Sequence, residues 1–192
     1  MSTGPDHPVT MVSWEDAKGY CRWLTEKERR EGLIRGDQSY RLPTDAEWSL
    51  AAELEEEGGS TPKEKSRKIE GVFPWGTQWP PPKGAGNFAD MTAKSRFSDW
   101  PVIEGYNDGY ATTSPVGSFK PNRYGLYDMG GNVWQWCQDW YDGEQKLRVL
   151  RGGSWLNGQP VSLLSSTRLS NPPVGGGGFM GFRCVLAAGS AP

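Results

Sequence analysis

The part of the sequence after Gly71 constrains the fold most, because it carries no helical periodicity. Short aromatic or β-branched pieces alternate there with Gly, Pro, Asn and Asp, a pattern that predicts short strands joined by turns. The 10 Trp, 7 Tyr and 6 Phe argue against disorder, since disordered chains are poor in aromatic residues. We expect strands over residues 72–75, 114–119, 125–127, 133–140, 147–150 and 179–186.

The N-terminal third has a different character and predicts two helices. A capping box at residues 13–16 precedes an apolar stripe at helical spacing, so a helix is expected over 13–31, ended by Gly32. A second capping box at residues 44–47 predicts a helix to about Glu53. Two helices followed by short strands indicate an α+β fold. The 192 residues make one domain, 1–192, at the usual size of roughly 100–200 residues.

Composition and charge exclude several function classes. A net charge of −2 argues against nucleic-acid binding. No apolar run approaches the roughly 20 residues of a membrane span, and no signal-peptide core follows Met1, so the localisation stays undefined. His7 is the only histidine and the 3 cysteines are scattered, which leaves no Ser-His or Cys-His site and no zinc motif. Cys21 is expected in the core, and the acidic run 53–57 in a solvated loop without a binding role.

A series of motifs in order resembles the formylglycine-generating enzyme (sulfatase-modifying factor) family over residues 8–186. The resemblance implies a variant of the C-type lectin-like fold, with Trp134, Trp136, Trp140 and Trp155 filling a core that has little regular structure. Arg183 is expected to pair with a carboxylate. The matching segments are PVTMVSW at 8–14, YRLPTDAEW at 40–48, FPWG at 73–76, YGLYDMGGNVWQW at 124–136, RVLRGGSW at 148–155 and GFRC at 181–184.

The resemblance implies the family's fold but does not imply its oxidase chemistry. That chemistry uses two cysteine thiolates a few residues after the Gly-Gly-Ser-aromatic motif, because thiolates suit a soft copper ion. In this chain the two positions fall at about Asn157 and Ser162, which are poor soft-metal ligands. The related sulfoxide synthases need several histidines for iron, and this chain has one. We therefore expect no enzyme activity and no catalytic cofactor.

Residues 156–180 contain no Asp, Glu or Lys, although 23% of the chain is charged. The segment, inside a possible variable region at 148–184, resembles the variable proteins of diversity-generating retroelements, in which template adenines are copied with errors. An AAY codon with both adenines randomised accounts for every residue from 156 to 179 except Gln159. The resemblance implies a surface that binds an unknown protein or other macromolecule. The expected apolar contacts are Leu156, Val161, Leu169, Val174 and Phe179, and the expected polar or backbone contacts are Asn157, Gly158, Ser162, Thr167, Ser170, Asn171 and Gly175.

Two other functions stay open: a fixed-sequence interaction or regulatory module of the same fold, and a formylglycine-generating-type oxidase. Nothing in the sequence identifies a sugar site, because a lectin-type fold alone does not imply carbohydrate binding.

The resemblance also implies structural calcium, which prefers oxygen ligands. One site would use Asn87 with the carbonyl of Phe88, and Asp108 with the carbonyl of Tyr110. The alternative is a purely structural role, in which Asn-Asp-Gly at 107–109 only forms a turn. A second, less well matched site would use Asp128, the carbonyls of Gly131 and Val133, and Gln135, where the family pattern has Glu.

Overall fold

The computed structural model describes residues 4–54 and 57–189 and contains both expected helices. Helix α1 (Trp14–Arg30) begins at Ser13, whose hydroxyl accepts from the backbone N–H of Asp16 while the Asp16 carboxylate accepts from Ser13. It ends at Glu31, and Gly32 follows with φ +69°. Helix α2 (Asp45–Ala51) has the same reciprocal cap at residues 44 and 47. Both capping boxes are confirmed, and α2 stops two residues earlier than expected.

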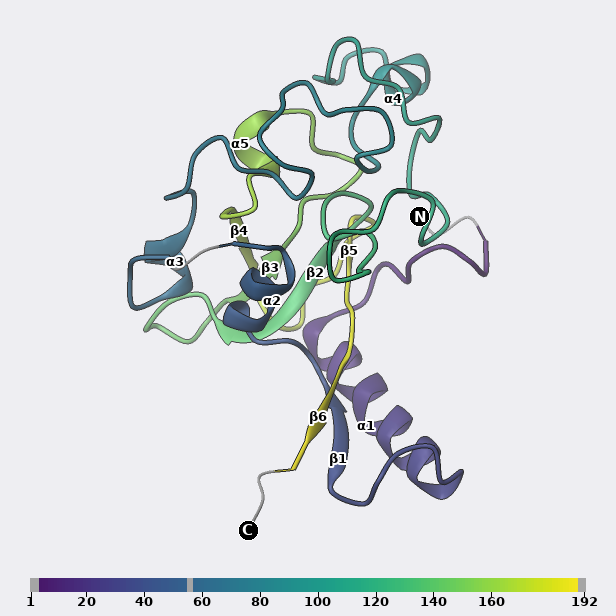
Figure 1. The fold of residues 1–192 in the computed structure, drawn as a ribbon, viewed down its shortest axis with the longest axis vertical. Helices are drawn as coiled ribbons and strands as arrows, with labels where there is room; N and C mark the ends of the chain where they lie inside the picture. The colour runs from purple at the N-terminus through teal and green to yellow at the C-terminus, as the bar shows by residue number, and fades with distance from the viewer. Residues whose placement is uncertain (1–3, 55–56, 190–192) are drawn as a thin grey trace.

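Two small sheets organise the chain (Figure 1). Strand β1 (Gln38–Arg41) pairs antiparallel with β6 (Val185–Ala188) and lies beside α1. The second sheet has the order β4-β3-β2-β5. Its strands are β2 (Trp134–Trp140), β3 (Arg148–Arg151), β4 (Arg168–Asn171) and β5 (Met180–Gly181). The pairs β2–β3 and β3–β4 are antiparallel, whereas β2–β5 is parallel.

Three expected strands are absent from the part of the chain that the structure describes. Gly117 and Gly125 adopt φ +75° and +74°, which breaks the extended backbone over 114–119 and 125–127. Over 72–75 the backbones of Phe73 and Gly76 bond to each other across a tight turn. The expected strand at 179–186 divides into β5 and β6.

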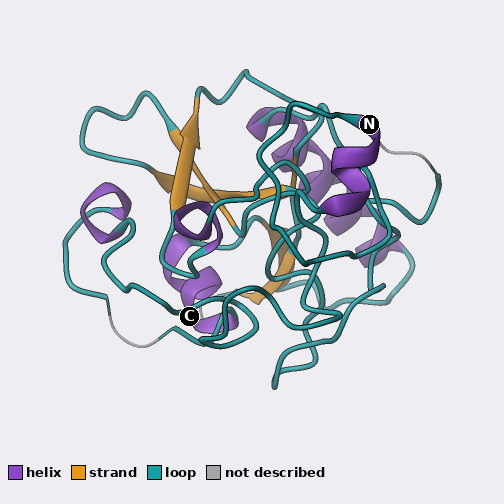
Figure 2. Ribbon diagram, turned by 90° about the horizontal axis from the view of Figure 1, so that it is seen from above, coloured by secondary structure: helices purple, strands orange, loops and turns teal. Residues whose placement is uncertain are grey.

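Three short helices were not expected from the sequence: α3 (Pro62–Lys65), α4 (Met91–Arg96) and α5 (Pro160–Leu163). Each is too short to show an apolar period, although Thr61 and Asp90 cap the first two. Long loops surround the small sheets in the view from above (Figure 2). No helix among residues 4–54 and 57–189 is long and apolar enough to cross a bilayer.

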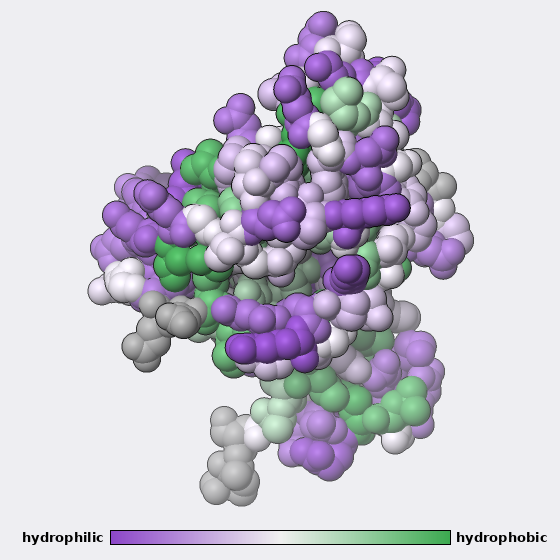
Figure 3. Space-filling view, turned by 45° about the horizontal axis from the view of Figure 1, so that its top comes forward, coloured by the Kyte–Doolittle hydropathy of each residue, from purple (hydrophilic) through white to green (hydrophobic). Residues whose placement is uncertain are grey.

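Tryptophans connect α1 to the larger sheet. The indole N–H of Trp14 donates to the carbonyl of Cys137 at 2.9 Å, and that of Trp136 donates to Val12 at 3.1 Å. Trp134, Trp136 and Trp155 are buried as expected, whereas Trp140 is half-buried and stacks on a guanidinium. On the surface, apolar residues appear in separate patches between hydrophilic ones (Figure 3).

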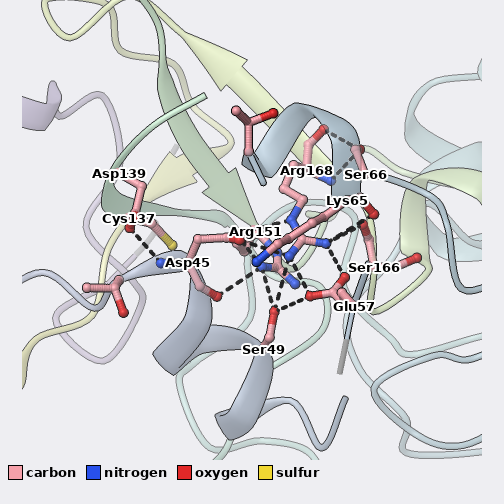
Figure 4. A network of polar contacts seen from close by, with 12 residues as sticks. Asp45, Ser49, Glu57, Lys65, Ser66, Cys137, Asp139, Arg151, Ser166 and Arg168 are labelled. Atoms are coloured by element: carbon pink, nitrogen blue, oxygen red, sulfur yellow. Dashed lines mark hydrogen bonds and ion pairs between the residues drawn. The ribbon is translucent and has the colours of Figure 1, made fainter. Parts of the chain in front are cut away.

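A buried ionic network joins α2 to β3 and β4 (Figure 4). Arg151 and Arg168 have fully buried side chains, and both bond to the carboxylate of Asp45. Arg168 also pairs with Glu57, whose side chain is 4% exposed. The expectation that the acidic run 53–57 is solvated is therefore wrong for Glu57. Residues 55 and 56 of that run lie outside the described residues.

Candidate functional site

The segment 156–179 is closed at both ends by buried groups. The indole of Trp155, at one end, donates to the carbonyl of Gly178, at the other, over 3.1 Å. The backbone N–H of Trp134 donates to the carbonyl of Phe179 at 2.8 Å, which fixes the second end to β2. The segment therefore starts and finishes on the same rigid frame, as a surface that presents side chains requires.

Residues 156–159 form a turn that leads into α5, beside the segment 89–102 that contains α4. The Asn157 carbonyl accepts from Ala89, and its side-chain oxygen accepts from both the backbone and the hydroxyl of Ser154. A Cβ at Gly158 would lie 2.6 Å from the carbonyl oxygen of Pro101. Asn157 and Gly158 thus hold the turn, while Val161 is 42% exposed and Leu156 and Ser162 are half-buried.

The middle of the segment runs through the interior. Thr167 is 2% exposed, and its hydroxyl donates to the carbonyl of Val161 at 2.6 Å. Leu169 is half-buried and packs against the core beneath α1. Thr167 cannot act as the exposed hydrogen-bonding residue that the sequence suggested, because neighbouring side chains cover it. The lone charge in the segment, Arg168, belongs to the buried network.

The last part, 170–179, lies along the N-terminal segment. The carbonyls of Pro173 and Gly177 accept from Trp14 and Met11, each at 3.0 Å. A Cβ at Gly175 would lie 2.4 Å from the amide nitrogen of Asn171, so this glycine has no room for a side chain while Asn171 keeps its position.

Exposure along this part is uneven. Val174 is 81% exposed, while Ser170 and Asn171 are half-buried on the edge strand β4 and Phe179 packs on the core. Among the contacts expected from the sequence, six have side chains that reach solvent and do not hold the loop. We call these the display positions: Leu156, Val161, Ser162, Ser170, Asn171 and Val174.

The cysteines lie away from positions 157 and 162. Cys137 is fully buried in β2, and burial raises the pKa of its thiol. Cys21 of α1 and Cys184 face each other with 3.4 Å between their sulfurs. The hydrogen bond between them lowers the pKa of Cys21 and raises that of Cys184. Among the described residues no three His, Cys, Asp or Glu side chains gather to hold a metal ion.

In the first expected calcium site, Asp108 contacts the backbone of Phe88. Asp108 accepts from the backbone N–H groups of Phe88 and Tyr110, both at 2.8 Å. Burial raises the pKa of Asp108 to about 7. Asn87 is fully buried, and its side-chain NH₂ donates to Thr112, while its side-chain oxygen has no protein partner. A buried amide oxygen without a donor, and a carboxylate hydrogen-bonded to the backbone of the next residue, are oxygen ligands of the kind that a hard cation prefers.

In the second expected calcium site the side chain of Gln135 is already engaged, whereas Oδ1 of Asp128 is buried without a partner. The guanidinium of Arg183 donates to the side-chain oxygen of Gln135 and to the carbonyls of Tyr127 and Asp128. Of the expected ligands, Gln135 is thereby turned toward a positive charge, which disfavours it as a metal ligand. The expected carboxylate pairing of Arg183 is wrong, because carbonyl oxygens accept its hydrogen bonds.

Sequence reasoning missed the buried partners of Arg168. The available signal was that Arg168 is the only charged residue from 156 to 180. A single charge inside an otherwise uncharged segment indicates a specific partner, since an isolated buried charge costs several kcal/mol.

The fold and these motifs define a family. A family model described as "Sulfatase-modifying factor enzyme 1-like domain" matches residues 1–188, and the chain belongs to this family. It is 34% identical over 208 residues to a formylglycine-generating enzyme of Streptomyces coelicolor, covering 97% of this chain and 56% of the relative. It is 35% identical over 197 residues to inactive C-alpha-formylglycine-generating enzyme 2 of Bos taurus, covering 97% and 52%. The family thus includes enzymes and inactive members, and this chain spans about half their length.

A solved structure supports the fold class. Treponema denticola variable protein 1 matches with a TM-score of 0.58 and 25% identity, over 95% of this chain and 72% of that one. The expected α+β fold of C-type lectin-like type is confirmed, as is the family.

Proposed function

We propose that this chain is a non-catalytic ligand-binding protein, of the kind encoded by diversity-generating retroelements, and that 1–192 forms one domain. The observation that carries the proposal is the segment 156–179. It is closed by Trp155 and Phe179 at its ends, held by Thr167 and Arg168 in the middle, and exposed at the display positions between them. The likeness to a Treponema denticola variable protein supports it.

The physical advantage of this arrangement is the separation of stability from recognition. Exchanges at exposed positions cost about ±0.5 kcal/mol, whereas cavities or unpaired charges in the interior cost several times more. A preorganised backbone also reduces the entropy lost on binding, so a few exposed side chains can supply the affinity. Val161 and Val174 are the most exposed apolar residues available as anchors in the segment.

The chemistry of positions 157 and 162 supports a non-catalytic role. The Asn157 side-chain oxygen is engaged by Ser154, and the three cysteines lie on other elements. The oxidase alternative predicts copper bound by paired thiols. Copper titration with thiol counting on the native protein tests it, and copper binding that disappears when Cys21 and Cys184 are replaced by Ser would favour the oxidase.

The gene locus provides the direct test of diversification. We expect a near-copy of the coding region for 148–184, with adenines at the differing positions, and a reverse transcriptase gene nearby. Sister clones should differ at Leu156, Val161, Ser162 and Val174 but keep Thr167 and Arg168. A locus without the copy, and clones without variation, would favour a fixed-sequence interaction module of the same fold.

A library provides the physical test of the same proposal. Randomising the display positions should leave the melting temperature within a few degrees of the parent and change which target is captured. Randomising the same number of interior positions from 163 to 168 is the matched control and should yield mostly unfolded protein. Equal losses of folded protein in both libraries would refute the separation of stability from recognition.

We further propose that Asn87 and Asp108, with the carbonyls of Phe88 and Tyr110, hold a structural calcium ion. The unpartnered oxygen of Asn87 supports this proposal. When bound, the ion would link the two loops by shared coordination and neutralise the buried carboxylate. Calcium should raise the melting temperature of protein treated with chelator, magnesium should do so less, and Asp108→Asn should abolish the effect. An identical melting temperature with and without calcium would refute the site.

A further inference from the structure

A groove of about 480 Å³ lies where α1 meets β1, β2 and β3, and none of its lining residues belongs to the segment 156–179. Buried Trp14, Cys21 and Leu42 supply an apolar floor. The lining also includes basic side chains of α1, β1 and β3: Lys18, Arg22, Arg41 and Arg148. An apolar floor under a cationic rim is complementary to an amphipathic anion.

The cations of the rim differ in how far the protein already neutralises them. Arg41 bonds to both carboxylate oxygens of Glu47 at 2.6 Å, so its charge is compensated. Lys18 and Arg22 have no carboxylate within 4.0 Å in residues 4–54 and 57–189. Lys18 instead lies 4.2 Å from the centre of the Trp14 ring. Two uncompensated cations thus remain at the groove.

Arg148 lines one side of the groove, and its contacts with two tryptophans and a carbonyl fix the position of its side chain. Its guanidinium lies 3.8 Å from the ring centre of Trp14 and 3.3 Å from that of Trp140, and it donates to the carbonyl of Gln138. Its Nε–H is buried and has no partner among the described groups. Burial lowers the pKa of the Arg148 guanidinium, and this effect outweighs the nearby negative charges of Glu15 and Asp139, which raise it. A buried donor without an acceptor is costly, and an acceptor supplied by a ligand would remove that cost.

We propose that this groove binds a small organic anion that carries one carboxylate on an apolar body. The volume matches the roughly 300–1,000 Å³ of small-molecule sites. The carboxylate would meet Lys18 and Arg22, and it would supply the acceptor that the Nε–H of Arg148 lacks. The apolar body would lie against Tyr40, Cys21 and Leu42, because Lys18 and Arg148 already cover the Trp14 ring.

The residues that line the groove differ from the display positions, so the protein would bind a second ligand at a second site. The two sites adjoin, because β3 pairs Arg148 with Asn171 and the backbone N–H of Trp14 donates to Pro173.

The test uses 2-naphthoate as the probe and the full chain at low salt, with binding measured by calorimetry. The neutral analogue 2-naphthalenemethanol and inorganic phosphate are the comparison probes. We expect 2-naphthoate to bind at least about tenfold more tightly than either, because only it combines charge with an apolar body.

A pair of double variants makes the test specific to the groove. Lys18→Gln/Arg22→Gln should weaken 2-naphthoate binding about tenfold or more. Lys27→Gln/Arg30→Gln removes the same charge from α1 outside the groove and should change the affinity less than about twofold. Thermal melts show whether each variant folds.

Several outcomes would overturn the proposal. One is equal weakening in the two double variants, which would mean only a general attraction to the helix. Others are equal affinity for the alcohol, equal affinity for phosphate, or no detectable binding of 2-naphthoate.

Discussion

Replacing Arg168 by Met removes the cation that joins β4 to α2 and to Glu57. The Nε and Nη2 atoms of Arg168 donate to the two carboxylate oxygens of Asp45 at 3.1 and 2.9 Å, and its other bonds reach Glu57. All of these side chains are at most 5% exposed. Met keeps much of the aliphatic volume, so the main effect is electrostatic.

The expected loss follows from what is left unpaired. Arg151 still balances Asp45, but the Glu57 carboxylate would keep only the hydroxyl of Ser49. Removing one partner of a buried ion pair costs roughly 3–5 kcal/mol. At about 2–4 °C per kcal/mol for a chain of this size, the melting temperature should fall by roughly 6–20 °C.

Denaturant unfolding and calorimetry measure the effect, with Lys63→Met as the control. Lys63 pairs with Asp142 at the surface, and breaking an exposed pair costs about 0–1 kcal/mol. The double variant Arg168→Met/Glu57→Leu should be more stable than Arg168→Met alone, because no uncompensated charge remains. A loss in Arg168→Met no larger than in the control, or a double variant less stable than the single one, would refute the reasoning.

Three further predictions test other parts of the structure. Burial raises the pKa values of Asp45 and Glu57, but the interactions with Arg151 and Arg168 outweigh it, so both pKa values lie below their usual range. The stabilisation is complete above the unfolded values near pH 4 and is lost as pH falls further. The urea concentration at the unfolding midpoint should therefore decrease as the pH falls below about 4, and it should decrease less steeply in Asp45→Asn. Mild oxidation should remove two titratable thiols by joining Cys21 to Cys184, whose sulfurs are 3.4 Å apart, and three thiols surviving in the unfolded protein would contradict this. Gly158→Ala should cost about 1–3 kcal/mol in chemical denaturation because its Cβ would clash with Pro101, whereas Gly36→Ala, with open space around it, should cost little; similar stabilities would count against the clash.

The sequence predicted the elements whose determinants are local. Capping boxes at 13–16 and 44–47 located both main helices, because a cap is formed within four residues. Runs of aromatic and β-branched residues located β2 and β3, because this signal is also carried by residues that are neighbours in the sequence. The single-turn helices and the missing strand at 114–119 depend on tertiary contacts and on the backbone at Gly117, which periodicity does not report.

The candidate site was harder to predict, because exposure depends on partners distant in sequence. The segment's borders follow from the motifs, but nothing in the sequence near Thr167 indicates that this side chain faces inward and that of Val174 faces solvent. The partner of Arg168 is Asp45, 123 residues away along the chain. Only the three-dimensional arrangement separates side chains available to a ligand from those that hold the loop.

The hydrogen bonds from Met11 and Trp14 to the loop at 173–177 connect two regions that are distant in the sequence, so that the position of one depends on the other. Cleavage between Met11 and Trp14 would separate the bond at Gly177 from α1, while Trp14 would keep its bond to Pro173. The turn around Val161 has no such hydrogen bond to residues 4–14, and it is held instead by Ala89 and Ser154. Proteolysis there would therefore loosen the part of the loop that carries Val174 and leave the turn that carries Val161 unchanged.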